Sequence, residues 1–231
     1  TGSGVIVRES GSGAAQLKYV VYRGQLKVNE YTPLNASTIC GQANAAGAMA
    51  VGAVLYTNTP AYGNAPSAAS FSSRGGTPVN GVLRNKPDIM APNGVNTSVS
   101  LGGVNIDGDA FPNFFGTSAS APHAAGVAAL LAHAKQKYYG SALTPDNMRS
   151  VMQSTAIDMG TPGYDVVSGA GYVEADRALA SLANPAPYLS VLKYDTTKKP
   201  GVDTLVLKIR GEYLRPTSTV WFNGAPLTNS V

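Results

Sequence analysis

Residues 116–123 read Gly-Thr-Ser-Ala-Ser-Ala-Pro-His, and a stretch rich in alanine and leucine continues from there to about Tyr138. This pattern predicts a helix that begins close to Ser118. The glycine before the serine permits a tight approach of the chain to a substrate. A helix N-terminus directs free N–H groups and the positive end of the helix dipole at one point, which suits a developing oxyanion. Ser118 therefore fits an acyl-transfer nucleophile, while Ser118 or Thr117 would equally fit a simple helix cap.

Buried strands and helices alternate around this segment. Residues 48–55 (Ala-Met-Ala-Val-Gly-Ala-Val-Leu) suit a strand buried on both faces, as in a parallel sheet. Turn-forming residues fill 57–82, and residues 86–92 (Lys-Pro-Asp-Ile-Met-Ala-Pro) predict a very short strand. A second helix is predicted from Thr144, which can cap it, to about Ala156, and a third over 173–182. This order of elements predicts an α/β domain with a mostly parallel sheet.

The chain resembles the subtilase family of subtilisin-like, S8-type serine peptidases. Gly-Thr-Ser-Ala-Ser-Ala-Pro-His at 116–123 is similar to the nucleophile signature of that family, and the resemblance gives Ser118 the nucleophile's role. Four other segments are similar to the family in the same order: 50–54, 69–75, 86–92 and 169–173. The resemblance implies part of a subtilisin-like three-layer domain, and proteolysis by a Ser-His-Asp triad.

The other catalytic residues of the family are missing from this chain. In subtilases the Asp, the His and an oxyanion-hole asparagine all precede the nucleophile, whereas both histidines here, His123 and His133, follow Ser118. His123 matches the structural histidine of the family's Pro-His pair, and we expect neither histidine to act as a base. Asn44 and Asn64 lie too late in the chain to match the oxyanion asparagine, so neither is assigned a role.

Shifts in composition predict the domain organisation. Residues 1–184 are assigned to the C-terminal part of a subtilisin-like peptidase domain, with residues 1–38 as an insertion. A linker (Asn-Pro-Ala-Pro, 184–187) precedes residues 185–231, which alternate with a period of two. Through residues 207–224 this last part resembles the start of an immunoglobulin-like IPT/TIG domain, which implies a truncated all-β sandwich. Because neither end looks complete, we expect the chain to be a piece of a longer protein.

Composition argues against several function classes. Of the 231 residues 13% are charged and 44% hydrophobic, with 26 glycines, as is typical of a compact globular protein. The formal net charge of +4 comes from scattered basic residues without a run that would follow a phosphate backbone, so no nucleic-acid partner is expected. No stretch is long and apolar enough to span a bilayer. The single cysteine, Cys40, cannot form an intrachain disulfide and is predicted to be a small buried hydrophobe.

The resemblance predicts a secreted or cell-surface serine endopeptidase that acts on protein or peptide substrates. The chain itself would supply only the nucleophile Ser118 and would be inactive alone. No cofactor is required. Calcium is common in the family that the chain resembles, but no acidic cluster in this chain is assigned to it; Asp107 and Asp109 are a weak candidate, which we interpret as part of a polar loop. Two other classes stay open: a catalytically inactive subtilase fold that serves as a binding scaffold, and a surface adhesin with immunoglobulin-like modules. The oligomeric state is left open.

Overall fold

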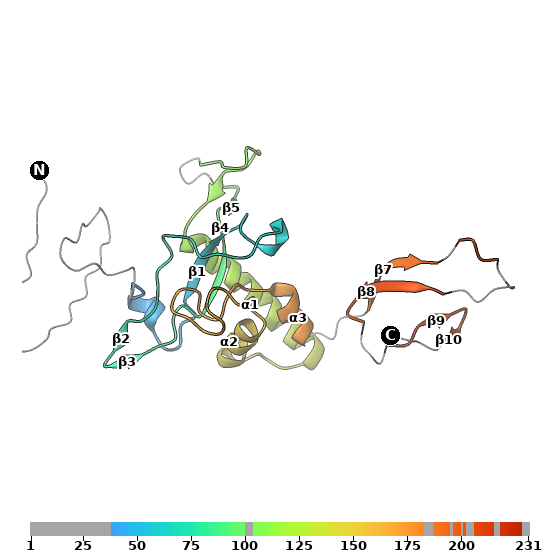
Figure 1. Cartoon of the computed structure of the whole chain (residues 1–231). Coiled ribbons are helices and arrows are strands. Elements are labelled where there is room, and N and C mark those ends of the chain that lie inside the picture. Colours follow the sequence, from blue (N-terminus) through green and yellow to red (C-terminus); the bar gives the residue numbers. More distant parts are fainter. Residues whose placement is uncertain are drawn as a thin grey trace, which may run out of the picture. The chain divides into compact units, whose positions relative to one another are not determined.

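The computed structural model describes residues 38–99, 104–182, 187–194, 196–199, 201, 206–214 and 218–227. Except for Thr38, the predicted insertion over 1–38 lies outside these residues, as does most of the linker at 184–187. The chain divides into two compact units, whose elements are labelled in Figure 1. Unit 1 comprises the described residues up to Ala121 together with Asp158–Tyr172, and unit 2 comprises Pro122–Ile157 and the described residues from Val173 onward.

Unit 1 is built around a parallel pair of strands, β1 (Val51–Leu55) and β4 (Ile89–Asn93). The central residues of both strands are buried, as expected for short apolar runs in a parallel sheet. Val54 and Met90 of these strands form a small core with Met159, against which Ala68 and Tyr172 pack. The strand predicted within 48–55 is therefore confirmed, with its first residue at Val51.

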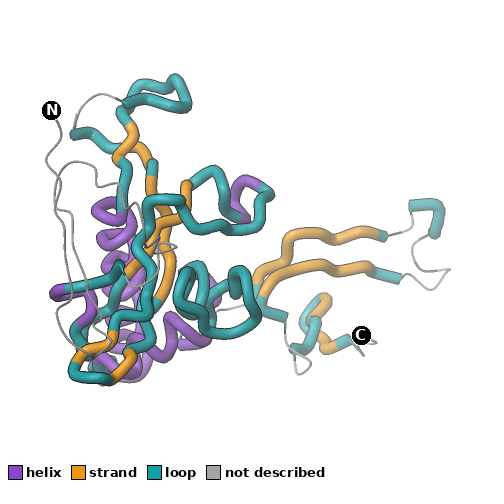
Figure 2. Tube along the Cα trace, turned by 60° about the vertical axis from the view of Figure 1, so that its left-hand side comes forward, coloured by secondary structure: helices purple, strands orange, loops and turns teal. Residues whose placement is uncertain are grey.

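The remaining strands of unit 1 are short, and they appear in orange between longer loops in Figure 2. They form two antiparallel pairs, β2 (Pro78–Val79) with β3 (Val82–Leu83) and β5 (Val95–Asn96) with β6 (Asn113–Phe114). Two single-turn 3-10 helices, η1 (Gly41–Asn44) and η2 (Pro60–Tyr62), complete the described regular structure of this unit up to the long helix.

The prediction of a mostly parallel sheet in the peptidase domain is confirmed for β1 and β4 and is wrong for the other described strands of unit 1. These strands form antiparallel pairs: two residues join β2 to β3, which is too short for the crossover that parallel pairing needs, whereas residues 97–112 separate β5 from β6 in the sequence. Between β2 and β3 the connection is Asn80-Gly81, and both residues have positive φ (51° and 76°), as a tight hairpin turn requires.

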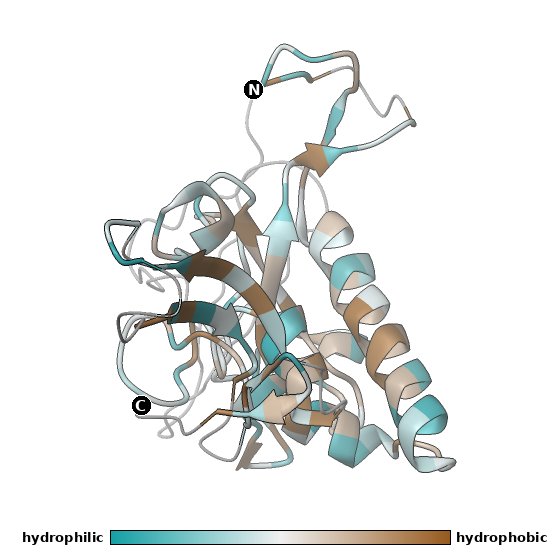
Figure 3. Cartoon of the chain, turned by 90° about the vertical axis from the view of Figure 1, so that its right-hand side faces the viewer, coloured by the Kyte–Doolittle hydropathy of each residue, from teal (hydrophilic) through white to brown (hydrophobic). Residues whose placement is uncertain are grey.

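The three predicted helices are all present, each with ends within two residues of the prediction. They are α1 (Thr117–Tyr139), α2 (Pro145–Ser154) and α3 (Ala175–Leu182). Thr144 caps α2 as expected, because its hydroxyl accepts the N–H of Asn147 at 3.3 Å. Helix α1 begins in unit 1 and continues into unit 2, and Figure 3 shows hydrophobic and hydrophilic segments alternating along it. In unit 2, α2 packs against α3.

The described residues after 187 contain strands and turns only. β7 (Tyr188–Lys193) pairs antiparallel with β8 (Lys208–Glu212), and β9 (Trp221–Phe222) with β10 (Ala225–Pro226). The Asn223-Gly224 turn between the last two has φ values of 47° and 77°, which confirms the predicted turn. The described part of this region forms no closed sandwich, so the IPT/TIG-like module and the boundary at 184/185 stay predictions.

A close backbone approach explains the glycine at position 169. Gly169 has φ +64°, and a Cβ there would lie 2.3 Å from the carbonyl oxygen of Pro87. We expect Gly169→Ala to lower the free energy of unfolding by about 2 kcal/mol or more, because the backbone strain adds to a clash with a neighbouring main chain. Gly163→Ala is the matched control, since Gly163 also has positive φ but a Cβ added there would meet no atom within 4 Å. Equal losses for both variants in urea unfolding would contradict the clash.

Candidate active site

The turn that carries the serine lies between β6 and α1. Gly116 has φ +108°, a conformation that L residues rarely adopt, so the glycine is required by its backbone. Its carbonyl accepts the N–H groups of Ala119 (2.9 Å) and Ser120 (3.3 Å), which makes Gly116 the N-cap of α1. Helix geometry leaves the N–H groups of Thr117 and Ser118 without an intrahelical acceptor. The cap residue of α1 is therefore Gly116, and neither Thr117 nor Ser118 occupies that position.

Two serines in the first turn of α1 differ in exposure. Ser118 is exposed, whereas Ser120 is fully buried and its hydroxyl has no hydrogen-bond partner among the described residues. A nucleophile has to reach its substrate, so the exposure of the two side chains favours Ser118. The free N–H groups and the positive end of the dipole of α1 meet at the same place, which suits stabilisation of an oxyanion.

Both histidines of the chain follow Ser118 on helix α1. His123 and His133 both lie on α1, the first half-buried and the second exposed, and no hydrogen bond joins either to Ser118 within the described part of the chain. Asn44 is buried and donates to the carbonyl of Thr77 at 3.2 Å. The exposed Asn64 donates to the carbonyl of Thr57 at 2.8 Å. That neither asparagine has a catalytic role stays a prediction.

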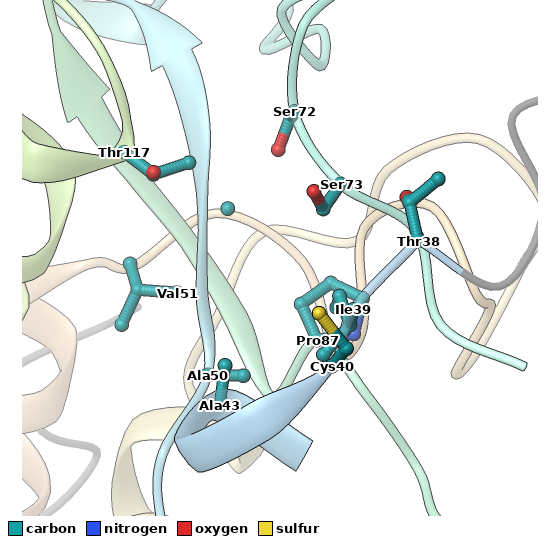
Figure 4. Close-up of a pocket in the computed structure, with 11 residues that line it drawn as sticks. Thr38, Ile39, Cys40, Ala43, Ala50, Val51, Ser72, Ser73, Pro87 and Thr117 are labelled. Carbon is teal, nitrogen blue, oxygen red and sulfur yellow. The ribbon is translucent and has the colours of Figure 1, made fainter. Parts of the chain in front are cut away.

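A hollow of about 200 Å³ opens beside the turn, as Figure 4 shows. Small and apolar groups line most of it, among them Val51 of β1, Ser72 and Thr117 at the start of α1. Ser72 is held there because its hydroxyl accepts the N–H of Ala53 at 3.0 Å. Cys40 also lines the hollow and is half-buried, so its predicted place in the core is wrong: its segment borders a surface depression.

A buried ion pair ties the segment before β4 to the entry of β1. Lys86 Nζ lies 2.7 Å from Asp88 Oδ2, and their side chains are 3% and 4% exposed. The same carboxylate oxygen accepts the N–H of Ala50 at 2.7 Å, and Lys86 Nζ also donates to the carbonyl of Ala48. The Lys-Pro-Asp segment thus holds β4 against β1. Sequence reasoning missed this pair, although two charged residues beside a buried strand were a signal for it.

At the other end of β4, the chain is tied to the serine-bearing turn. Asn93 is 1% exposed, and its Oδ1 accepts the N–H of Gly116 at 3.4 Å. The neighbouring Gly94 donates to the carbonyl of Phe114 at 2.9 Å, and the side chain of Asn113 donates back to the carbonyl of Gly94 at 3.0 Å. These bonds fix residues 113–116 to the end of a buried strand. Sequence reasoning missed them too.

Side-chain amides and a tyrosine hydroxyl donate hydrogen bonds to the two aspartates of the Asp-Gly-Asp loop, residues 107–109. Asp107 Oδ2 accepts hydrogen bonds from Asn113 Nδ2 (3.1 Å) and from the hydroxyl of Tyr56 (2.9 Å). The bond from Asn113, followed by that from Tyr56, lowers the pKa of Asp107. Asp109 accepts a hydrogen bond from Asn96. In the described part of the chain, no group of three or more His, Cys, Asp or Glu side chains could hold a metal ion.

Tyr56 is expected to titrate well above an ordinary tyrosine. Its hydrogen bond to the Asp107 carboxylate is the main reason that its pKa is raised to about 12. The pKa of Tyr56 in the folded protein lies above that in the unfolded chain. The hydrogen bond to Asp107 therefore stabilises the fold fully below pH 10, and this stabilisation is lost as the pH rises toward 12. A difference titration against Tyr56→Phe measures it, and Asp107→Asn should return the pKa toward about 10. A midpoint near pH 10 with Asp107 intact would contradict the bond.

Comparison with known proteins identifies the family. The model of the Subtilase family matches residues 22–181, well over half of the chain. The chain belongs to the subtilase family. The prediction drawn from the nucleophile signature and its companion segments is thereby confirmed at the level of the family.

Individual subtilases resemble only part of this chain, and the chain matches only part of them. Subtilisin-like protease SBT2.3 of Arabidopsis thaliana is 32% identical over 123 residues, which are 50% of the chain and 14% of that protein. Fervidolysin of Fervidobacterium pennivorans is 33% identical over 125 residues, or 51% of the chain and 17% of fervidolysin. The chain thus spans less than a fifth of the length of these two relatives.

Solved structures that are similar to this chain include the following two. The crystal structure of fervidolysin, described as a keratinolytic enzyme related to subtilisin, covers 76% of this chain and 28% of its own at 22% identity, with a TM-score of 0.42. The match to the prenylagaramide maturation protease PagA covers 64% of this chain and 47% of the PagA chain at 21% identity, with a TM-score of 0.46.

Among the described residues of the subtilase chain, no helix has the length and hydropathy needed to cross a membrane.

Proposed function

We propose that this subtilase chain belongs to a serine endopeptidase in which Ser118 is the nucleophile. The observation that carries the proposal is the exposed Ser118 in the first turn of α1, two residues after Gly116, whose positive φ suits only a glycine. Ser120 in the same turn is buried, which argues against it as the nucleophile. Family membership supports the reaction class, and the position of the serine supports the residue.

The proposed reaction is acyl transfer in two steps. A histidine oriented by an aspartate takes the proton of Ser118 Oγ as the oxygen attacks the carbonyl carbon of the scissile peptide bond. The N–H of Ser118 and the side-chain amide of an asparagine donate to the oxyanion of the tetrahedral intermediate. The histidine then protonates the leaving amine, and water hydrolyses the acyl ester on Ser118. We propose that the histidine, aspartate and asparagine come from a segment of the longer protein that precedes this chain.

The 231-residue chain alone is expected to have essentially no peptidase activity, because without a base the serine stays a neutral alcohol. Internally quenched peptides with blocked ends, assayed with the full-length protein and with the isolated chain, test this. Cleavage by the full-length protein alone supports the proposal. Steady turnover by the isolated chain that is lost on Ser118→Ala would contradict the need for an outside base.

A second candidate is a catalytically inactive subtilase fold that serves as a binding scaffold. This alternative requires that the full-length protein lack the Asp or the His of the triad. It predicts that a folded full-length protein cleaves no peptide and does not react with serine-directed reagents.

Under the peptidase proposal we also infer protein or peptide substrates, a secreted or cell-surface location, and a β module after residue 184 that acts outside the catalytic domain.

A further inference from the structure

Asn93 is a buried amide at the point where β4 ends. Its side chain is 1% exposed, and its Oδ1 accepts the N–H of Gly116 at 3.4 Å across 23 residues of sequence. Its Nδ2 is buried as well and has no hydrogen-bond partner among the described residues. Since the N–H of Gly116 needs an acceptor, the amide oxygen must face it, and this orientation leaves the amide nitrogen unpaired.

A half-satisfied amide is an unfavourable way to end a buried strand. Leaving a buried donor unpaired costs free energy that an apolar residue of similar size would not incur. The neighbouring residues of β4 are apolar or proline, and Ile89, Met90 and Ala91 are fully buried. Asn93 is therefore best explained by what its oxygen holds.

The oxygen of Asn93 holds the residue that starts the nucleophile helix. Gly116 is bound on both sides: its N–H by Asn93, and its carbonyl by the N–H groups of Ala119 and Ser120. Ser118 lies in the turn that the bonds to the Gly116 carbonyl close, two residues after Gly116 and directly before Ala119. A shift of Gly116 would thus redirect both the hydroxyl and the free N–H of Ser118. Because Asn93 belongs to a strand paired with β1 through Leu55, its oxygen is a rigid reference for the turn.

We propose that Asn93 is a positioning residue for Ser118: by accepting the N–H of Gly116, it sets the direction in which the serine hydroxyl and N–H face a substrate. The inference rests on the proposed function for its effect on turnover, and on the structure alone for the anchoring of Gly116. Asn93 itself touches no substrate, because its side-chain atoms are buried beneath the turn.

Three variants of the full-length protein test the proposal. Asn93→Ala removes the acceptor, and Asn93→Asp keeps an oxygen that can accept the N–H of Gly116 whether or not the carboxyl group is ionised. Asn64→Ala is the matched control. Asn64 is exposed, and its side-chain amide donates to the carbonyl of Thr57. Urea unfolding curves establish that each variant is folded before its activity is compared.

The kinetic readout separates positioning from stability. We expect Asn93→Ala to lower kcat, and the rate at which a fluorophosphonate modifies Ser118, by about 10- to 100-fold, with KM changed by less than about threefold. Asn93→Asp should recover most of both rates, and Asn64→Ala should match the unmodified protein. A purely structural role would move the unfolding midpoint of Asn93→Ala without this split between kcat and KM or the rescue by aspartate.

Amide hydrogen exchange over residues 114–120 gives a readout that needs no activity. Asn93→Ala should speed exchange at Gly116, and Asn93→Asp should not. If Gly116 exchanges faster but the unmodified protein never reacts at Ser118, the proposed function falls while the anchoring stands. If a folded Asn93→Ala variant keeps the exchange rate at Gly116 and the fluorophosphonate rate unchanged, the inference is overturned.

Discussion

Ser118→Ala in the full-length protein is expected to lower kcat for an internally quenched peptide by about 10⁴- to 10⁶-fold. The methyl group cannot form the acyl ester, so only the catalysis that comes from binding and the oxyanion donors would be left. The substitution removes one exposed oxygen from the first turn of α1, so the unfolding midpoint should hardly change.

Ser120→Ala is the matched control for this prediction. The hydroxyl of Ser120 is fully buried without a partner among the described residues, so its removal should cost little stability and leave kcat near that of the unmodified protein. Loss of activity in Ser120→Ala together with retained activity in Ser118→Ala would show that the chemistry had been assigned to the wrong serine. Loss in neither would exclude both as nucleophiles.

Lys86→Met is expected to lower the free energy of unfolding by about 3–5 kcal/mol, the second large effect. The substitution leaves the carboxylate of Asp88, whose side chain is 4% exposed, without its buried cation, and it removes a donor to the carbonyl of Ala48. Urea unfolding monitored by circular dichroism measures the loss. Adding Asp88→Asn to Lys86→Met should recover part of it, because a neutral amide needs no counter-charge.

The ion pair of α2 is the control for the buried one: its carboxylate faces solvent, although the side chain of Arg149 is 21% exposed. Arg149 and Asp146 are 3.4 Å apart, and the side chain of Asp146 is 93% exposed. Asp146→Asn should therefore cost less than about 1 kcal/mol. A loss for Lys86→Met no larger than that of Asp146→Asn would contradict the view that the Lys86–Asp88 pair holds β4 in place.

The local elements of the fold could be predicted because their signals lie within a few residues. Thr144 and the proline after it mark the start of α2, and the glycine at 116 marks that of α1. The pairing of the short strands could not be predicted in the same way. β5 and β6 are separated by a loop whose composition does not indicate which segments will pair, and strand pairing depends on contacts distant in sequence.

The same distinction holds for the candidate site. The signature around Ser118 could be found in the sequence, but the exposure that separates Ser118 from Ser120 depends on how the turn sits on unit 1. The bond from Gly116 to Asn93 spans 23 residues, and an asparagine before a glycine is ordinarily interpreted as a turn. The half-buried position of Cys40 likewise follows from the hollow beside it, which no local pattern indicates.

The most direct test of the central claim is to treat the folded full-length protein with a fluorophosphonate and to map the modified residue by mass spectrometry. A nucleophile activated by a neighbouring base reacts covalently, whereas ordinary serines do not. We predict one phosphonyl group per molecule, on the peptide that contains Ser118, and none in the Ser118→Ala variant. Modification at a different serine in a protein that cleaves peptides, or no modification of a folded protein, would contradict the assignment of Ser118 as the nucleophile.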